Sequence, residues 1–402
     1  MKKKILWIST ACLLIGVNFV LRYMHINKIE ETIDIVSDKL LEHGLKLTYD
    51  KISYGNIGFW NVSARMVKPV FLQERQGFSD KSSVEYIDLT HSLITKSLKV
   101  ESSDKINTLI TDANGEQKYS STFTSAPAFN VKLKGYLITQ NEFLEKNRLE
   151  RYFIKYVDEL NYTSSGHITS KVEKDDTVTS ISSVDNFTVK LTNQSVEDHT
   201  GFNVKFNSDK AKYFSTPTSD SYAKLNSELG EISLIGDLNC SFDFKDDARI
   251  NLNEEVILAD VKPVYKLHID TLKLTTQPYS FQIDGDMVLG KTQMIPFFDL
   301  KFGVVNYTNL LNFYFNFYNT LFANADIMRA LSLGMIQDNQ KAAVIKLFEK
   351  VASKSQNDKY ELRITQLKEA PMMIGTYSFD EVAAMYNKLI EQKGEGDTKA
   401  IE

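Results

Sequence analysis

The sequence predicts an α+β protein: a single N-terminal transmembrane helix, then a large, mostly antiparallel, curved β-sheet domain with helices packed on it and a helical C-terminal part. Three observations indicate this class. An apolar run follows three lysines at the N-terminus, β-type segments fill residues 45–305, and helical periodicity returns after residue 306. With 43% hydrophobic and 25% charged residues, the 402-residue chain has the composition of a folded protein.

The N-terminus predicts a membrane anchor. Residues 1–4 form a basic tip that is expected to stay in the cytoplasm, and residues 5–23 form the predicted transmembrane helix. The run from Ile5 to Leu21 has Asn18 as its only strongly polar side chain, and its length just spans a bilayer core. No cleavage site of small residues follows the run, which favours an uncleaved anchor over a signal peptide.

An amphipathic helix is predicted over residues 24–44. Apolar residues recur there at alternating spacings of three and four, which is typical of one helix face. They are Ile26, Ile29, Ile33, Val36 and Leu40. Gly44 is a plausible C-terminal cap. The pattern is too short for a coiled coil, so we expect this helix to pack on the domain that follows it.

Residues 45–305 are expected to form the β-rich body. Asn114-Gly115 lies between two β-type runs and is a strong hairpin signal, and Asp284-Gly285 is interpreted as a turn of the same kind. A helix is predicted to interrupt the strands within residues 141–160, and a short one within residues 219–229. The first carries an apolar stripe of Leu149, Tyr152, Phe153, Tyr156, Val157 and Leu160.

Residues 306–393 are expected to be mainly helical and packed on the same sheet, and residues 394–402 to be a disordered tail. One helix is predicted from Asp338, a candidate N-cap, and a last helix from the cap residue Ser378. A strand is predicted between them, within residues 360–367. No repeat, proline-rich linker or low-complexity tract divides the chain, so one elongated domain is expected.

The stretch "LLNFYFNFYNTLF", residues 310–322, is the most aromatic part of the chain. Read as a helix, its asparagines and Asn309 fall on one narrow seam, which predicts a helix from about Thr308 to Leu333. Burial against the concave face of the sheet is the favoured interpretation. The alternative is an apolar ligand-binding surface, whose candidate residues are Phe313, Tyr314, Phe315, Phe317 and Tyr318.

The segment "GDMVLGKT", residues 285–292, satisfies the phosphate-loop expression through Gly285, Gly290, Lys291 and Thr292. Such a loop needs a helix directly after it, and Pro296 leaves no room for one. The residues between the two glycines are typical of a strand. We therefore interpret the segment as a β-hairpin and the nucleotide-binding motif as a false positive.

No other motif predicts a chemical site. Residues 243–254 resemble a calcium loop, but Ala248 stands where the sharp turn needs glycine. None of the six histidines has a metal-binding spacing, and Cys240 is expected to be a small buried hydrophobe. We therefore predict no catalytic residue, no metal and no cofactor. The formal net charge of −5 argues against nucleic acid as a partner.

The order of these features resembles a bacterial membrane-anchored periplasmic family, catalogued as domain of unknown function 2125. The matching pieces are the segment from Gly44 to Tyr54, Gly58-Phe59 and Ile374-Gly375. The family often has Gly-Phe-Pro where this chain has Trp60 in the third position. The resemblance implies a bacterial inner-membrane protein with its N-terminus in the cytoplasm and its bulk in the periplasm, and it supplies no catalytic residue.

The function predicted from these features is a structural or assembly role in the cell envelope, without catalysis. The predicted partners are the membrane, through the single span, and an unidentified envelope protein. The alternative is the binding or transfer of a lipid or other apolar ligand in a β-groove. Nucleotide binding at residues 285–292 is the remote alternative.

Overall fold

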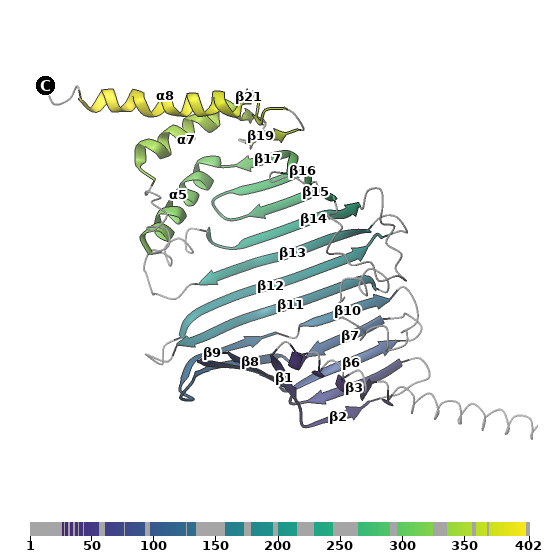
Figure 1. The fold of residues 1–402 in the computed structure, drawn as a ribbon. Coiled ribbons are helices and arrows are strands. Elements are labelled where there is room, and N and C mark those ends of the chain that lie inside the picture. Colours follow the sequence, from purple (N-terminus) through teal and green to yellow (C-terminus); the bar gives the residue numbers. More distant parts are fainter. Residues whose placement is uncertain are drawn as a thin grey trace, which may run out of the picture. The chain divides into compact units, whose positions relative to one another are not determined.

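The protein is described by a computed structural model that divides into two compact units, Met1–Asn193 and Gln194–Glu402 (Figure 1). Each unit is built mainly from antiparallel β-sheet, as the sequence predicts. The residues that the structure describes are 26–27, 29–30, 33–34, 37–38, 40–42, 44–55, 61–75, 77–92, 97–125, 127–133, 157–172, 178–195, 200–214, 229–243, 264–289, 296–324, 336–355, 359–367 and 370–398.

The first unit contains twelve described strands. They are β1 (Leu45–Thr48), β2 (Lys51–Tyr54), β3 (Asn61–Val67), β4 (Val70–Arg75), β5 (Phe78–Val84), β6 (Tyr86–Ser92), β7 (Ser97–Ser102), β8 (Lys105–Asp112), β9 (Gln117–Thr124), β10 (Ala128–Leu133), β11 (Val157–Val172) and β12 (Val178–Asn193). The predicted Asn114-Gly115 hairpin joins β8 to β9 and is confirmed. Gly115 has φ +80°, and Asp112 accepts hydrogen bonds from the amides of Asn114 and Glu116.

The strands of this unit form two arms that both start from β11. One half of β11 pairs with β10 and the other half with β9. The first arm continues from β10 through β7, β6 and β3 to β2, and the second continues from β9 through β8, β5 and β4 to β1. Strands that are consecutive in the sequence lie in different arms: β1 leads into β2, β3 into β4, β5 into β6, β7 into β8 and β9 into β10. The unit is therefore a meander of long strands that are each bent once.

The bends align in a row that we call the crease, formed by Asp50, Lys68-Pro69, Glu85, Ser103, Ser125 and Pro127. Three members of the crease are out of solvent: Pro69 is fully buried, Ser103 is 3% exposed and Ser125 is 5% exposed. Asp50, Lys68 and Glu85 are exposed. Serine hydroxyls supply hydrogen bonds where the ladder is interrupted. The amide of Glu85 donates to Ser103 Oγ at 3.0 Å, and Ser125 Oγ lies 2.9 Å from Ser164 Oγ. Hydrogen bonds of serine side chains thus stabilise the bend at the crease.

The two faces of the bent sheet differ in polarity. Residues directly opposite each other in paired strands share a face. Ala64, Leu89, Val100 and Phe129 form one such row on the inside of the bend, which we call the inner face. The outer face carries ion pairs instead, among them Arg65–Asp88, with two contacts of 2.6 and 2.7 Å. This alternation is typical of antiparallel sheet with one buried face.

Described residues between 26 and 42 are helical and connect the free ends of the two arms. Near one end of this helix Glu30 accepts a hydrogen bond of 2.7 Å from the hydroxyl of Tyr54, at the end of β2. Burial and this bond raise the pKa of Tyr54. The other end leads through Gly44, with φ +77°, into β1. Ile33 is 6% exposed, so the helix contributes to the core at this edge.

The second unit contains nine described strands and three described helices. They are β13 (Thr200–Phe214), β14 (Ile232–Asp243), β15 (Val264–Thr275), β16 (Ser280–Leu289), β17 (Phe297–Val305), α5 (Tyr307–Asn324), α7 (Asp338–Val351), β18 (Ser353–Lys354), β19 (Lys359–Gln366), β20 (Met373–Ile374), β21 (Tyr377–Ser378) and α8 (Phe379–Thr398). From β13 to β17 each strand pairs with the next, and β19 pairs with β17.

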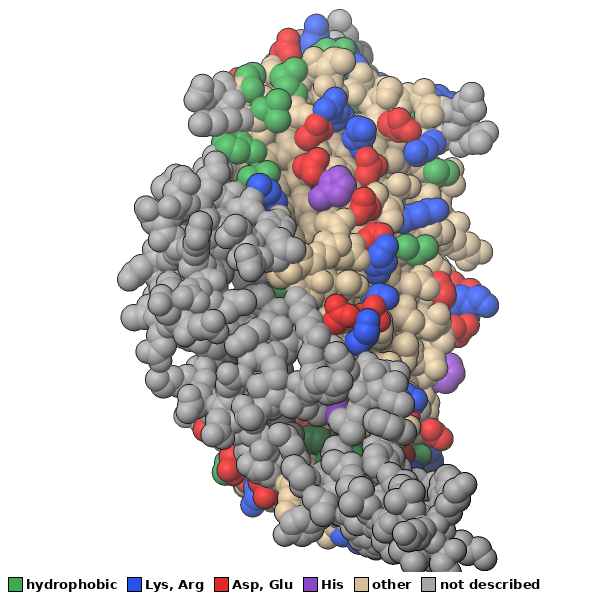
Figure 2. Space-filling model, turned by 90° about the vertical axis from the view of Figure 1, so that its right-hand side faces the viewer, with side chains coloured by type: hydrophobic (Ala, Val, Ile, Leu, Met, Phe, Trp, Pro, Cys, Tyr) green, Lys and Arg blue, Asp and Glu red, His purple; other side chains and the backbone are tan. Residues whose placement is uncertain are grey.

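One face of the second sheet is apolar and the other polar. Phe281 stacks on Phe302 on the apolar face, where Val304 is 2% exposed. Arg363 forms a bidentate ion pair with Asp299 on the polar face. Acidic and basic side chains are mixed in this way on the surface viewed in Figure 2. This unit therefore also exposes charge on one side of its sheet and keeps aromatic residues on the other.

The helices pack through aromatic side chains. The Tyr307 ring at the start of α5 lies 5.0 Å from Phe348 in α7 and 4.5 Å from Tyr360 in β19, measured between ring centroids. The predicted cap of α8 is confirmed: Glu381 donates its amide to Ser378 Oγ and accepts the amide of Ser378. The cap residue of α7, however, is Gln337, so the prediction of Asp338 was wrong by one residue.

Two further local predictions are wrong. Asp284-Gly285 makes no turn, because both residues lie inside β16, where Asp284 pairs with Lys301 and Gly285 with Leu300. Val157 and Leu160 lie in β11 and not in a helix, since cross-strand pairing with β10 overrides their helical spacing. The rest of that predicted helix, and most of the short helix predicted within residues 219–229, lie outside the described residues.

The predicted transmembrane anchor is contradicted. Among the described residues, no helix combines the length and the apolar character that a membrane crossing requires. The 18 residues of α5 include a seam of asparagines, and the 20 residues of α8 include many charged ones. The prediction of a single-pass inner-membrane protein is corrected accordingly. Residues 5–23 themselves lie outside the described residues.

Candidate apolar binding site

A cavity of about 190 Å³ lies on the inner face of the first unit, directly at the crease. Both arms contribute to its wall: strands β4, β5 and β8 of the second arm and β6, β7 and β10 of the first arm line the same cavity. Its lining residues are Phe71, Ser82, Ser83, Val84, Ile87, Val100, Ser102, Ile106, Pro127 and Phe129. None of them is charged, and most are apolar.

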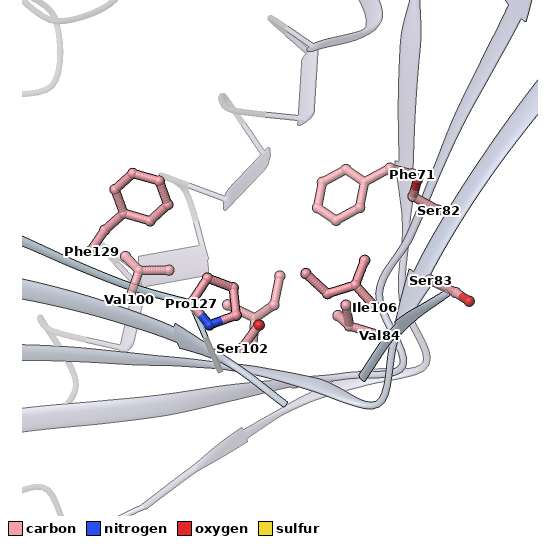
Figure 3. A pocket seen from close by; sticks show the side chains of 10 residues that line it. Phe71, Ser82, Ser83, Val84, Val100, Ser102, Ile106, Pro127 and Phe129 are labelled. Carbon is pink, nitrogen blue, oxygen red and sulfur yellow. The ribbon is translucent and has the colours of Figure 1, made fainter. Parts of the chain in front are cut away.

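The bend brings the apolar side chains of the two arms toward each other. Phe71 and Ile106 come from the second arm, and Val100 and Phe129 from the first (Figure 3). Val100 and Phe129 are directly opposite in β7 and β10. Side chains that would be separate on a flat sheet therefore converge because each strand bends at the crease.

Two of the three serine hydroxyls at the wall form hydrogen bonds within the protein. Ser82 Oγ lies 3.0 Å from Thr108 Oγ1, and Ser102 Oγ donates to the carbonyl of Ser103 at 3.1 Å. Ser102 thus uses its one O–H donor within the protein, and Ser82 shares one hydrogen bond with Thr108. The cavity therefore offers shape and apolar contact.

An aromatic row extends the cavity across the sheet. Phe129 forms part of the cavity wall and is still 43% exposed. Its ring centroid lies 4.6 Å from that of Tyr162 in β11, which lies 5.9 Å from that of Phe187 in β12. The cavity is thus continuous with an aromatic row, Phe129–Tyr162–Phe187, on the same face.

The five aromatic residues predicted as a ligand-binding surface lie in a different place, on α5 of the second unit. The helix is confirmed over Tyr307–Asn324. Its aromatic side chains do not form one wall, because Phe315 is 3% exposed whereas Tyr314 is 54% and Phe317 41% exposed. Phe313 packs on Tyr279 with ring centroids 5.9 Å apart, and Tyr318 is half-buried.

The asparagine seam of α5 holds the helix in place. Asn309 donates to the carbonyl of Pro278 at 3.0 Å. Asn319 exchanges two hydrogen bonds with the backbone of Ile336, at 3.1 and 2.8 Å. A cavity of about 200 Å³ lies at the start of this helix, where Tyr307 donates its hydroxyl to Glu349. These polar groups serve the packing of the helix.

The first half of the phosphate-loop match, residues 285–289, forms a strand and not a loop. Gly285 lies within β16, as do the three residues from Met287 to Leu289. Gly290, Lys291 and Thr292 lie outside the described residues, as does most of the calcium-loop match at 243–254. A helix N-terminus does not follow Gly285, so the described part of the segment lacks the geometry that binds phosphate.

Most ion pairs of the described residues join one acidic and one basic side chain, and His268 is an exception. No group of three or more His, Cys, Asp or Glu within the described ranges is placed to hold a metal ion. His268 lies between two carboxylates, with Nδ1 2.7 Å from Asp286 and Nε2 3.3 Å from Asp270. Cys240, predicted to be buried, is half-buried, and this partial burial raises the pKa of its thiol.

Neither the motifs nor the composition of the sequence predict the crease cavity. The one sequence signal for it is a set of breaks in the β-type runs. Val84, Ser102 and Pro127 each lie at or next to a break in a β-type run, and the breaks fall at nearly the same level in paired strands. Aligning the breaks requires knowledge of the strand register. No known protein family matches the chain, and no curated protein matches it. The resemblance noted above therefore stays a prediction.

Proposed function

We propose that the inner face at the crease binds the alkyl chain of an amphiphile, and that the protein acts as a binding protein and not as an enzyme. The single observation that supports this most is the cavity of about 190 Å³ with uncharged walls from both arms. An apolar cavity of roughly 150 Å³ is enough to bind benzene. The cavity can therefore hold a short hydrocarbon segment.

The physical gain comes from contacts that the empty cavity lacks. Apolar wall atoms without partners lose dispersion energy, and an alkyl chain restores those contacts while it leaves water. Each buried methylene contributes about 0.8 kcal/mol. The hydroxyls of Ser82 and Ser102 form hydrogen bonds within the protein. An alkyl chain can therefore contact these two residues while their hydrogen bonds stay in place.

The test is equilibrium binding of radiolabelled hexadecanoate to the full chain, below its critical micelle concentration. We expect saturable binding that Ile106→Trp abolishes, because the indole fills the space in front of Val84 and Ser102. The matched control is Leu109→Trp. Leu109 is three residues further along β8 and therefore faces the outer side, so its replacement should leave binding unchanged.

Thermal unfolding of both variants separates loss of the site from loss of the fold. Equal binding by Ile106→Trp and wild-type protein would overturn the proposal, and so would the absence of saturable binding to a folded wild-type chain. A structural or assembly role that acts through the protein surface requires no alkyl ligand. The same experiment therefore distinguishes the two functions.

A further inference from the structure

We infer that the ligand is a long, unbranched alkyl chain that lies across the strands, with its end in the crease cavity and its length along the aromatic row. This inference rests on the proposed function and specifies its ligand. It follows from the position of Phe129, which lines the cavity, is 43% exposed and is also the first member of the row.

The inner face is continuous from β6 to β12. Ile87 in β6 and Ser102 in β7 are directly opposite and both line the cavity. Val100 then pairs with Phe129, and Phe129 pairs with Tyr162. Since directly paired residues lie on one face, the ligand can pass from the cavity to Tyr162 without crossing to the polar side.

The length of this path selects a long chain. From β6 through β7, β10 and β11 to β12 there are four strand spacings, which amount to about 19 Å at about 4.8 Å each. One acyl chain occupies about half of a hydrocarbon core of roughly 30 Å. The path is thus long enough for the whole alkyl chain of a membrane amphiphile.

The outer side of the same strands cannot take such a chain. Lys190 in β12 pairs with Glu159 in β11 at 2.6 Å, and Asn161 donates to the same carboxylate at 2.6 Å. Covering these groups with hydrocarbon would remove them from water at a large free-energy cost. The polarity of the two faces therefore restricts the chain to the inner one.

The test compares octanoate, dodecanoate and hexadecanoate on the full chain by competition with radiolabelled hexadecanoate. Each additional fully buried methylene should raise affinity about fourfold, or about 250-fold for the four methylenes of one step. Because Phe129 leaves the row partly open to solvent, we expect a gain of at least about tenfold per step. Tyr162→Ala should weaken hexadecanoate by at least about tenfold and leave octanoate unchanged, because only the longer chain reaches β11. Asn161→Ala is the matched control on the outer face.

The outcomes separate this inference from the proposed function. If octanoate and hexadecanoate bind within about threefold of each other, the chain does not follow the row, and only the cavity binds. A Tyr162→Ala variant that weakens both acids equally contradicts the path as well. If no alkanoate binds, the proposed function itself fails.

The source of the chain is tested in a parallel arm. The protein is incubated with vesicles of dipalmitoyl phosphatidylglycerol and with free hexadecanoate at equal chain concentration, and the bound material is then extracted. Recovery of phospholipid identifies a membrane lipid as the source, and recovery of hexadecanoate identifies a free acid. Recovery of neither contradicts the inference.

Discussion

Ser103 shows how a single hydroxyl maintains the bend of the sheet. It is 3% exposed, and its Oγ accepts the amide of Glu85 at 3.0 Å across the crease. Ser103→Ala would leave that part-buried amide without its partner, which should cost about 1 kcal/mol, the low end of the range for unsatisfied buried donors. We expect the free energy of unfolding to fall by that amount in urea titrations.

The control for this change is Thr122→Ala in β9. The Thr122 hydroxyl donates to Asn107 at 3.1 Å in an exposed position, where water replaces the lost bond. Its effect should stay within about 0.5 kcal/mol. Equal effects of the two substitutions would show that the hydroxyl of Ser103 does not support the bend.

His268 makes the stability of the second unit depend on pH. The hydrogen bond with Asp286 is the main cause that raises the pKa of His268, and the charge of Asp270 adds to it. The stabilisation by the imidazolium is fully present below the unfolded pKa of about 6.5 and is lost as the pH rises through the raised folded pKa. Because the side chain is 51% exposed, we expect less than about 1 kcal/mol.

Proton NMR of the His268 ring measures this effect directly. Asp286→Asn should lower the midpoint of the titration, since it removes the carboxylate at 2.7 Å from Nδ1. The variant should also lose part of the decrease in unfolding free energy above about pH 6.5. An unchanged midpoint would contradict the assigned partner.

At the scale of elements, Gly285 allows β16 to pass between its neighbours. Its φ is +134°, and a Cβ atom there would lie 2.1 Å from the carbonyl oxygen of Asp299 in β17. Gly285→Ala combines a sparsely populated backbone conformation, which costs about 1–3 kcal/mol, with a clash against backbone. We expect a loss of at least about 2 kcal/mol in unfolding free energy.

Gly303→Ala in β17 is the matched control. An added Cβ there would meet only the flexible end of Lys359, 2.8 Å away, and no positive φ is required. The substitution should cost much less than the one in β16. If Gly285→Ala were tolerated equally well, the position would not have the backbone constraint that the structure assigns to it.

Local chemistry decided which elements could be predicted. Asn114-Gly115 and the Ser378–Glu381 cap are confirmed because each motif is complete within four residues. The helix at 307–324 is confirmed because its asparagine seam spans several turns. Motifs that carry their own hydrogen-bond partners are readable without tertiary information.

Tertiary context decided the rest. Asp284-Gly285 has turn chemistry, but pairing with β15 and β17 on both sides extends the strand through it. Val157 and Leu160 have helical spacing, but Leu160 is fixed between Val131 and Leu191 in the sheet. The crease was not predicted, since Ser103 reads as an ordinary loop residue until its strand neighbours are known.

At the scale of the whole molecule, aromatic residues serve two purposes. On α5 they pack the second unit, and sequence composition directed attention there because they are contiguous in the chain. In the first unit the cavity residues are spread from Phe71 to Phe129 and meet only through strand pairing. A binding site assembled by register could not be predicted from local composition.

The location of a bound chain tests the proposed function most directly. Hexadecanoate with a photoreactive diazirine at its terminal carbon is bound to the full chain and irradiated, and the modified residues are identified by mass spectrometry. We predict saturable modification at Val84, Val100 and Ile106, competed by unlabelled hexadecanoate and absent in Ile106→Trp. Modification centred on Tyr314 and Phe317 of α5, or no saturable modification, would contradict a binding site at the crease.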